Sequence, residues 1–216
     1  MQHIKHAIIS MAGLGSRLGF NTTKGLIKIG KKRIIDYQLS LLDDIPDIRI
    51  VVGFQEYDVM NHVKKIRDDI TFVRNPDFRT TSNSYSIYLA SKDLKDPYLI
   101  IDGDILINKN DFNNFLSNCN KESIVGLTQS KTEEAVFVSI DENKELIKEF
   151  QRSPKLKYEW TGIAYLNGIF IDKNQGYVYK ELEKNLPLKY NILDCYEIDT
   201  ESDFNLAKKN LHKLNL

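Results

Sequence analysis

Residues 7–17 read AIISMAGLGSR, and this stretch decides how the chain is expected to fold. Its first five residues are mostly apolar and partly β-branched, and they run into a glycine cluster, which is typical of a short strand buried on both faces. Two further runs, over residues 48–53 and 98–101, have the same character. Helical patterns separate these runs, so we predict parallel strands joined by crossover helices.

The remaining pattern extends this arrangement along the chain. In the last predicted helix, Thr200 and Asp203 are expected to form a capping box, and Asp111 is the expected cap of an earlier helix. Helices are predicted over residues 33–42, 59–66, 82–91, 111–116, 177–183 and 200–211, and further strands over 71–73, 123–128, 135–140, 147–151, 162–171 and 193–198.

These elements predict a single α/β, Rossmann-like domain over residues 1–216, in which a mostly parallel mixed central sheet is flanked by helices. Residues 1–130 form the predicted nucleotide-binding half. Residues 131–216 form the predicted acceptor-binding half, which also supplies a late metal ligand.

The composition narrows the class of partner. The 216 residues include 30 Lys+Arg and 30 Asp+Glu, so the formal net charge is zero, which argues against capture of nucleic acid by a basic face. No stretch approaches the ~18 consecutive apolar residues of a membrane span. The cysteines, Cys119 and Cys195, lie in no CxxC pattern and are interpreted as thiols in a reducing compartment. We expect a cytoplasmic protein without nucleic-acid or membrane partners, and the sequence leaves its oligomeric state open.

Basic residues follow the glycine cluster. Gly13 and Gly15 allow a loop to bring backbone N–H groups close to phosphates, Arg17 adds a planar cation, and Lys24 comes seven residues later. Neither the dinucleotide fingerprint GxGxxG nor a P-loop fits this spacing. The alternative is a plain turn with chance glycines, but the combination with Arg17 and Lys24 favours a triphosphate site.

An acidic motif follows the strand predicted over residues 98–101. Asp102 and Asp104 flank Gly103 at the carboxyl end of that strand, where open α/β sheets bind ligands. Two carboxylates there would repel each other unless a cation intervened, and Mg²⁺ prefers such oxygen ligands. The alternative is a solvated Asp-Gly turn.

A second acidic motif comes late in the chain. Glu197 and Asp199 point to the same face if their segment is extended. Acidic residues before a helix also favour its N-terminus without any metal, so capping of the helix that begins at Thr200 is the alternative interpretation.

Together, these sites resemble the sugar-phosphate and choline-phosphate nucleotidyltransferase superfamily. Its members carry a Gly-x-Gly-x-Arg loop followed by Pro-Lys, an acidic metal site after a central strand and a late acidic site before a helix. The corresponding segments here are residues 13–17, 23–24, 102–104 and 197–200, with Thr23 in place of the proline.

Two further segments sharpen this resemblance: residues 197–203 look like the cytidylyltransferase branch, and residues 75–86 look like the choline-phosphate cytidylyltransferases within it. The resemblance implies a nucleotidyltransferase architecture of the GT-A-like kind. It also implies transfer of CMP from CTP to a small phosphorylated acceptor, with release of pyrophosphate.

The resemblance implies roles for individual residues. Asp104 and Asp199 would hold Mg²⁺, with Glu197 as a further ligand candidate. Arg17 and Lys24 would stabilise the charge that builds on the α-phosphate and the leaving pyrophosphate. The nucleotide itself would contact Ala12, Gly13, Leu14, Gly15, Ser16, Asn83, Ser84 and Asp102.

Acceptor-binding residues are expected among Glu159, Trp160 and Tyr165. Aromatic faces beside a carboxylate would suit a quaternary ammonium such as choline through cation–π attraction, although the same rings are often simply core residues. A phosphorylated amino acid or amide used in the synthesis of capsules or other surface polysaccharides fits the same groups.

Three other functions stay open at this point. A sugar-1-phosphate nucleotidyltransferase would use the same chemistry. In a metal-dependent glycosyltransferase, Asp102 and Asp104 would be the DxD pair that holds a nucleotide-sugar, but the Gly-x-Gly-x-Arg loop is built for a triphosphate. A non-catalytic nucleotide-binding domain would need no late ligand such as Asp199.

Overall fold

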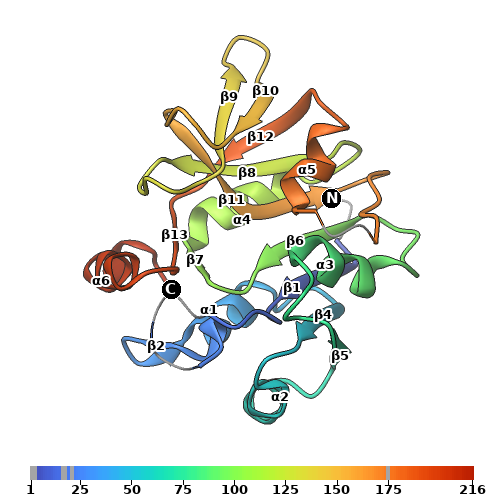
Figure 1. The fold of residues 1–216 in the computed structure, drawn as a ribbon, viewed down its shortest axis with the longest axis vertical. Helices are drawn as coiled ribbons and strands as arrows, with labels where there is room; N and C mark the ends of the chain where they lie inside the picture. The colour runs from blue at the N-terminus through green and yellow to red at the C-terminus, as the bar shows by residue number, and fades with distance from the viewer. Residues whose placement is uncertain (1–3, 16–18, 20–21, 174–175) are drawn as a thin grey trace.

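The computed structural model describes residues 4–15, 19, 22–173 and 176–216. Within this part of the chain, a nine-stranded sheet runs in the order β5-β4-β1-β6-β11-β8-β12-β10-β9 (Figure 1). Its first four strands are mutually parallel, with β1 between β4 and β6. They are β5 (Ile70–Arg74), β4 (Asp47–Val52), β1 (His6–Ser10) and β6 (Tyr98–Asp102).

The remaining strands are mainly antiparallel. Strand β11 (Tyr158–Leu166) joins the two halves, because it pairs antiparallel with both β6 and β8 (Ile124–Gln129). Strand β12 (Leu188–Ile192) is parallel to β8, and β10 (Leu146–Gln151) and β9 (Phe137–Asp141) complete the sheet with antiparallel pairings. The predicted α/β domain with a mixed central sheet is confirmed, with its parallel strands concentrated in the N-terminal half.

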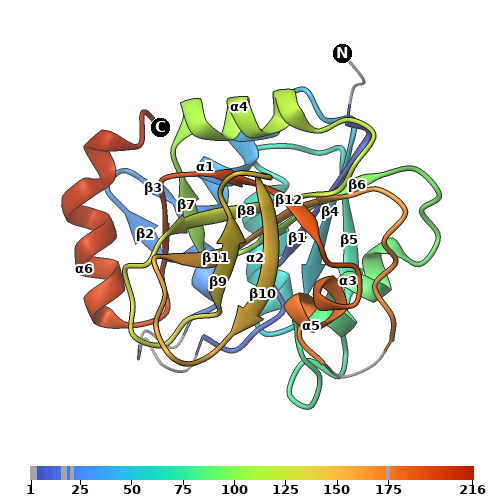
Figure 2. The same ribbon diagram turned by 90° about the horizontal axis from the view of Figure 1, so that it is seen from above.

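Helices cover both faces of the sheet (Figure 2). Alternate residues of β1 enter two separate cores, Ile9 on one face and Ile8 on the other, which is why the strand is apolar throughout. Among the described helices, none has the length and apolar character to cross a membrane. The Ile9 face carries α1 (Ile34–Leu41), α2 (Glu56–Val63) and α4 (Lys109–Asn118), and the Ile8 face carries α3 (Asn83–Ser91) and α5 (Val178–Glu183).

A small third layer lies next to the turn that follows β6. Strand β7 (Ile105–Ile107) pairs antiparallel with β13 (Cys195–Glu197), which brings the late acidic motif beside the first one. A third apolar cluster joins this layer to α6 (Glu201–Asn210) and to the hairpin of β2 (Lys28–Ile29) and β3 (Lys32–Arg33). Two 3₁₀ turns complete it, at Lys24–Leu26 and Leu211–Lys213.

The cap of α6 agrees with the prediction, whereas that of α4 does not. The Thr200 hydroxyl accepts a hydrogen bond from the Asp203 N–H and the Asp203 carboxylate accepts one from the Thr200 N–H, so the predicted capping box is confirmed. Helix α4 begins at Lys109, and its cap is Asn108, whose side chain accepts from the Asp111 N–H. Asp111 instead accepts a hydrogen bond from the Asp194 N–H at 2.8 Å.

The strand predicted over residues 162–171 is displaced. It runs over Tyr158–Leu166, because Gly162, with φ of 78°, lies in an irregularity inside the strand rather than at its start. The late strand predicted over 193–198 contracts to Cys195–Glu197, and β7 and β12 are not among the predicted strands. Strand β7 has three residues and β12 reads LKYNI, too short and too polar to be predicted from a pattern of apolar residues.

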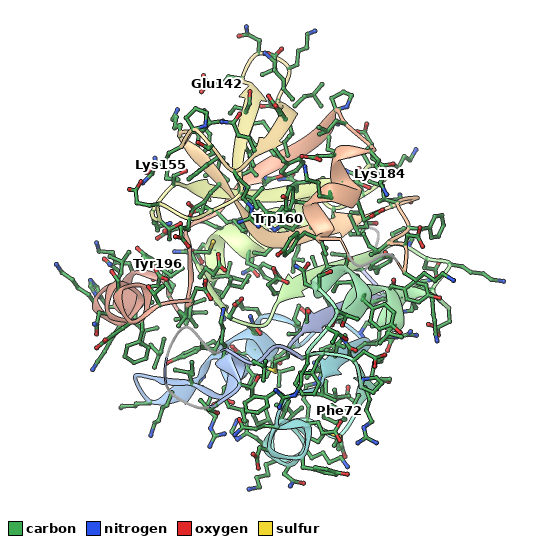
Figure 3. All side chains as sticks on the ribbon, in the orientation of Figure 1. Phe72, Glu142, Lys155, Trp160, Lys184 and Tyr196 are labelled. Atoms are coloured by element: carbon green, nitrogen blue, oxygen red, sulfur yellow. The ribbon has the colours of Figure 1, made fainter. Side chains whose placement is uncertain are left out.

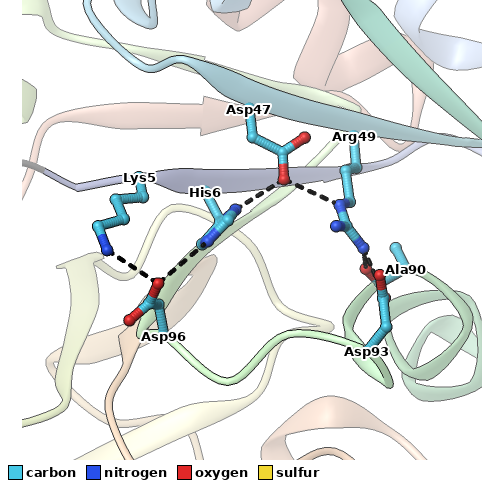
Figure 4. A network of polar contacts seen from close by, with 7 residues as sticks. All are labelled: Lys5, His6, Asp47, Arg49, Ala90, Asp93 and Asp96. Atoms are coloured by element: carbon cyan, nitrogen blue, oxygen red, sulfur yellow. Dashed lines mark hydrogen bonds and ion pairs between the residues drawn. The ribbon is translucent and has the colours of Figure 1, made fainter.

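A polar network holds together the amino ends of the parallel strands β1 and β4 (Figure 4). His6 Nδ1 lies 2.6 Å from Asp47 Oδ2, and Arg49 Nε donates to the same oxygen at 3.1 Å. The network ties these strands to α3 and the loop after it through Arg49–Ala90, Arg49–Asp93 and Lys5–Asp96. The network therefore helps to hold these secondary-structure elements together.

Candidate active site

A cleft of about 400 Å³ opens at the carboxyl ends of β1 and β6. One wall comes from the loop after β1, residues 23–25, the turn after β6 and the start of α3. The facing wall comes from residues 134–136, the residue after β10, the middle of β11, the start of α5, and the end of β13 with the segment after it. The cleft thus lies where ligands bind in open α/β sheets, beyond the carboxyl ends of the strands.

Gly13 and Gly15, in the loop after β1, lack a side chain for different reasons. Gly15 has φ of +60°, and a Cβ there would lie 2.9 Å from Lys24 Cγ and 3.1 Å from the Thr22 carbonyl oxygen, so the backbone itself requires glycine. A Cβ on Gly13 would meet nothing within 4 Å, although this residue lines the cleft. The missing side chain of Gly13 therefore leaves room for a ligand rather than relieving a strained backbone.

Lys24 reaches from this loop to both acidic motifs. Its Nζ donates to Asp104 Oδ2 at 2.6 Å and to Asp199 Oδ1 at 2.5 Å. The preceding residue, Thr23, fixes the start of this segment through hydrogen bonds to Gln55 and to the Met11 carbonyl. Burial disfavours the charged ammonium, but the two carboxylates outweigh burial and raise the pKa of Lys24 above its ordinary value. Lys24 is thus a permanent cation between two carboxylates.

Asp104, Glu197 and Asp199 form an acidic cluster. One carboxylate oxygen of each lies within 4.8 Å of the others. Glu197 and Asp199 point to the same side because they alternate with Ile198, whose side chain is fully buried. The Ile198 N–H donates to the Asp104 carbonyl at 2.9 Å, which brings Asp104 beside the other two residues. Three oxygen donors at this spacing suit a hard divalent cation such as Mg²⁺.

Asp102 lies against β11 at the base of the cleft. A Cβ on Gly162 would come within 2.5 Å of Asp102 Oδ2, so only glycine lets the two strands approach this closely. Burial and the negative charge of Asp104 raise the pKa of Asp102 to about 7, against the opposing effects of Lys24 and of a hydrogen bond from Asn83.

Glu197 has a similarly shifted pKa. Glu197 is exposed at the cleft, but the loss of hydration beside the surrounding protein groups, together with the charge of Asp104, raises the pKa of Glu197 to about 8. A cation bound here would relieve the repulsion among these carboxylates. We call Lys24 and the four carboxylates of Asp102, Asp104, Glu197 and Asp199 the acidic end of the cleft.

Gln38 of α1 supports the acidic end from beneath, and sequence reasoning did not identify it. Its side-chain amide donates to the carbonyls of Asp102 at 2.8 Å and Ile105 at 3.0 Å, and the residue is 1% exposed. These bonds hold both ends of the turn that carries Asp104. The sequence does contain a signal for Gln38, because a polar residue stands next to Tyr37 on the apolar face of a predicted helix.

Most of the predicted nucleotide-binding residues meet in the cleft, and Ser84 does not. Ser84 is fully buried, and its hydroxyl donates to the Gly176 carbonyl, so it serves to join α3 to the segment before α5. Ser16 and Arg17 lie outside the described residues. The predicted residues that line the cleft are Ala12, Gly13, Leu14, Gly15, Asn83 and Asp102, and Asn75 and Ser86, which were not predicted, line it too.

Of the three predicted acceptor-binding residues, one lines the cleft and two do not. Trp160, near the middle of the molecule in Figure 3, lines the cleft. Tyr165 belongs to the core on the α4 side, where its hydroxyl donates to the Asn120 carbonyl at 3.0 Å, because successive strand residues point to opposite faces. Glu159 is buried and accepts hydrogen bonds from the backbone of Lys131 and Thr132. We therefore no longer assign Tyr165 and Glu159 to the acceptor.

Other side chains stand beside Trp160 at this end of the cleft. They belong to Glu134, which precedes β9, to Arg152, which follows β10, and to Tyr177 and Tyr179 at the start of α5. We call Trp160 and these four residues the aromatic end of the cleft.

Residues 7–160, well over half of the chain, match the family model of the MobA-like NTP transferase domain. The chain belongs to this family. Over 97% of its length, this NTP transferase is 29% identical to the choline-phosphate cytidylyltransferase of Streptococcus pneumoniae (strain ATCC BAA-255 / R6), and the alignment covers 99% of that protein.

Solved structures place this NTP transferase among proteins of the same fold. A structure of CTP:phosphocholine cytidylyltransferase from Streptococcus pneumoniae superposes with a TM-score of 0.81 at 25% identity, covering 96% of this chain and 100% of that one. The inositol-1-phosphate CTP transferase of T. maritima superposes with a TM-score of 0.78 at 18% identity, over 98% and 96% of the two chains, which shows a shared fold. The predicted nucleotidyltransferase is confirmed, in preference to a glycosyltransferase or a non-catalytic domain.

Proposed function

We propose that this NTP transferase moves CMP from CTP to a small phosphorylated acceptor and releases pyrophosphate. The observation that carries the proposal is the convergence of Lys24 with Asp104 and Asp199 at 2.6 and 2.5 Å, in the cleft that the glycine loop also lines. Similarity over nearly the full length of a choline-phosphate cytidylyltransferase favours CTP over the other nucleoside triphosphates.

Asp104, Asp199 and Glu197 would hold a divalent cation, with Mg²⁺ the best match for three carboxylate oxygens within 4.8 Å of one another. When bound, this cation neutralises phosphate charge and orients the reacting groups.

The chain's own groups supply the rest of the mechanism. An acceptor phosphate oxygen attacks the α-phosphorus of CTP, the bond from that phosphorus to the bridging oxygen of the β-phosphate breaks, and pyrophosphate leaves with the electron pair. The acceptor phosphate is already ionised at neutral pH, so it needs no general base, and catalysis consists of positioning and charge stabilisation. Lys24, held at the acidic end, is placed to stabilise the charge that develops on the transferred and leaving phosphates.

The two walls of the cleft divide the substrates. In this proposal, residues 1–130 hold the nucleotide along the loop after β1, with Asn83 near the base. Residues 131–216 hold the acceptor at the aromatic end and contribute Asp199 to the shared acidic end. The acceptor is either phosphocholine-like or a phosphorylated amino acid or amide.

Pyrophosphate release tests the proposal directly. We would supply Mg²⁺, each of the four common NTPs in turn, and a panel of phosphocholine, phospho-amino acids and hexose 1-phosphates. The expected result is release with CTP and a member of the first two acceptor classes, absent in Lys24→Met. Release with a hexose 1-phosphate and another NTP would replace the proposal with a sugar-1-phosphate nucleotidyltransferase.

A further inference from the structure

The aromatic end of the cleft carries a cation on its ring faces. The Arg152 guanidinium carbon lies 5.5 Å from the centroid of the Tyr177 ring and 5.4 Å from that of Tyr179. The two tyrosine rings are themselves stacked, with centroids 5.9 Å apart. Arginine stacks on aromatic faces in this way while keeping its N–H groups free for a planar anion.

Packing fixes the Tyr179 ring on which this arginine lies. Tyr179 is only 8% exposed, and its ring lies 6.3 Å from Phe150, which packs edge-on against Trp160 at 6.2 Å. Two residues beyond Trp160, Gly162 contacts Asp102 at the acidic end. The layer of rings thus runs from Tyr179 to Trp160, on the same strand as the glycine that contacts Asp102.

Arg152 shares the Tyr179 ring with a second cation, Lys180, which is paired with Glu183, and Glu134 is the one carboxylate among the residues of the aromatic end. Lys180 lies over the same Tyr179 ring at 5.0 Å, and although its pKa is raised chiefly by the hydrogen bond to Glu183, the charge of Arg152 acts against that rise. Within the described part of the chain, Arg152 has ring contacts but no carboxylate at ion-pair distance. A quaternary ammonium brought to these ring faces would meet a like charge, whereas an anion would meet an unpaired guanidinium.

We propose that Arg152 makes the acceptor site specific for phosphorylated compounds that carry a second anionic group, namely a carboxylate. The proposal rests on the proposed function and deepens it, because it chooses a phosphorylated acid over phosphocholine as the class of acceptor. The reacting phosphate lies towards the acidic end, and the carboxylate of the same molecule pairs with Arg152 at the aromatic end.

Steady-state kinetics with acceptors of graded charge test this proposal. The panel contains 3-phosphoglycerate (carboxylate only), O-phosphoserine (carboxylate and ammonium), phosphoethanolamine (ammonium only) and phosphocholine. In the unaltered enzyme, kcat/KM should be highest for a carboxylate-bearing acceptor. Arg152→Met should lower that value by about 10- to 100-fold, as expected for loss of a charged hydrogen bond, while kcat/KM for phosphocholine stays level or rises. Arg152→Lys should recover part of the loss.

A matched control and a binding measurement make every outcome decisive. Arg79→Met removes another stacked arginine, 5.3 Å from the Phe78 ring, and should leave all four acceptors unchanged. Calorimetric titration of O-phosphoserine and phosphocholine should show that Arg152→Met weakens only the first. A preference for phosphocholine, or an equal loss for all four acceptors, overturns the proposal; an equal loss would mean that Arg152 binds the reacting phosphate. If no acceptor releases pyrophosphate from CTP, the proposed function fails, and the titration alone then decides about Arg152.

Discussion

At the acidic end of the cleft, a single added methyl group would collide with the protein. A Cβ on Gly103 would lie 2.7 Å from the Ser10 carbonyl oxygen, and one on Gly162 would lie 2.5 Å from Asp102 Oδ2. At the aromatic end, by contrast, Tyr177 is 53% exposed, and Glu134 and Arg152 are exposed as well. Groups that the proposed nucleotidyl transfer needs thus lie where packing is tight. Tyr177, Glu134 and Arg152, which the proposal places beside the acceptor, lie where substitution needs no repacking.

The largest expected effect is at the acidic end. Asp104→Asn and Asp199→Asn should each reduce kcat by on the order of 10²- to 10³-fold, because each removes a charged group proposed to bind the cation, and a partner of Lys24. Pyrophosphate release and the melting temperature, measured together, check this. Asp203→Ala is the control: it should lower the free energy of unfolding by about 1 kcal/mol through the lost cap without lowering kcat per folded molecule. Full activity in either acidic-end variant would remove its residue from the cation site.

A pair of glycine substitutions separates tight packing from ligand space. Gly162→Ala should destabilise the fold by about 1–3 kcal/mol, because alanine disfavours its φ of +78° and the methyl group would press on Asp102. Gly13→Ala should leave the melting temperature nearly unchanged and raise KM for CTP, since its methyl group would occupy only the cleft. Denaturant unfolding and CTP kinetics distinguish the two, and a normal KM for CTP in Gly13→Ala would mean that the nucleotide does not lie against this residue.

The acidic end should also make cation binding depend on pH. With the pKa of Asp102 raised to about 7 and that of Glu197 to about 8, we expect both groups to be largely protonated in the metal-free protein near pH 6 and largely deprotonated by pH 8.5. These raised values favour the metal-free fold at low pH, and that contribution is lost as pH rises through 7 and 8. A cation needs the deprotonated forms, so its affinity should rise by about tenfold or more from pH 6 to 8.5.

The rise in melting temperature that Mg²⁺ produces, compared at the two pH values, measures this dependence. Titratable groups remote from the cleft change the melting temperature equally with and without Mg²⁺. The pH dependence of the rise that Mg²⁺ produces therefore reports on the acidic end alone. An equal rise at pH 6 and pH 8.5 would contradict the assigned pKa shifts.

The smallest expected effect is that of a ring substitution at the aromatic end. Trp160→Leu should raise KM for the acceptor by about 2- to 10-fold, the scale of one aromatic contact, and leave KM for CTP unchanged. A larger effect on CTP than on the acceptor would show that the aromatic end belongs to the nucleotide, and the contrast between the two ends would fail. Tyr165→Phe, which removes only a hydroxyl hydrogen-bonded to Asn120, is a control on the same strand.

Prediction from sequence succeeded where a structure follows from near neighbours. The apolar run at residues 7–9 became a fully buried strand, and the Thr200–Asp203 box formed as predicted, because backbone alternation and capping act within a few residues. Prediction was wrong where the surroundings decide, as with Tyr165 and Ser84, which have the residue types of a binding site and the positions of core residues.

The sequence by itself determined the parallel strands, the glycine loop and the acidic residues available for a cation site, since each depends on residue type and local spacing. Only the tertiary structure decided which of them meet: Lys24 and Asp199, 175 residues apart, share a hydrogen bond because the pairing of β13 with β7 brings the late segment to the end of β6. The aromatic end arose in the same way, from side chains on β10, β11 and α5 that packing alone brings together. No local rule predicts such contacts, because their free energy comes from burial between segments far apart in the chain.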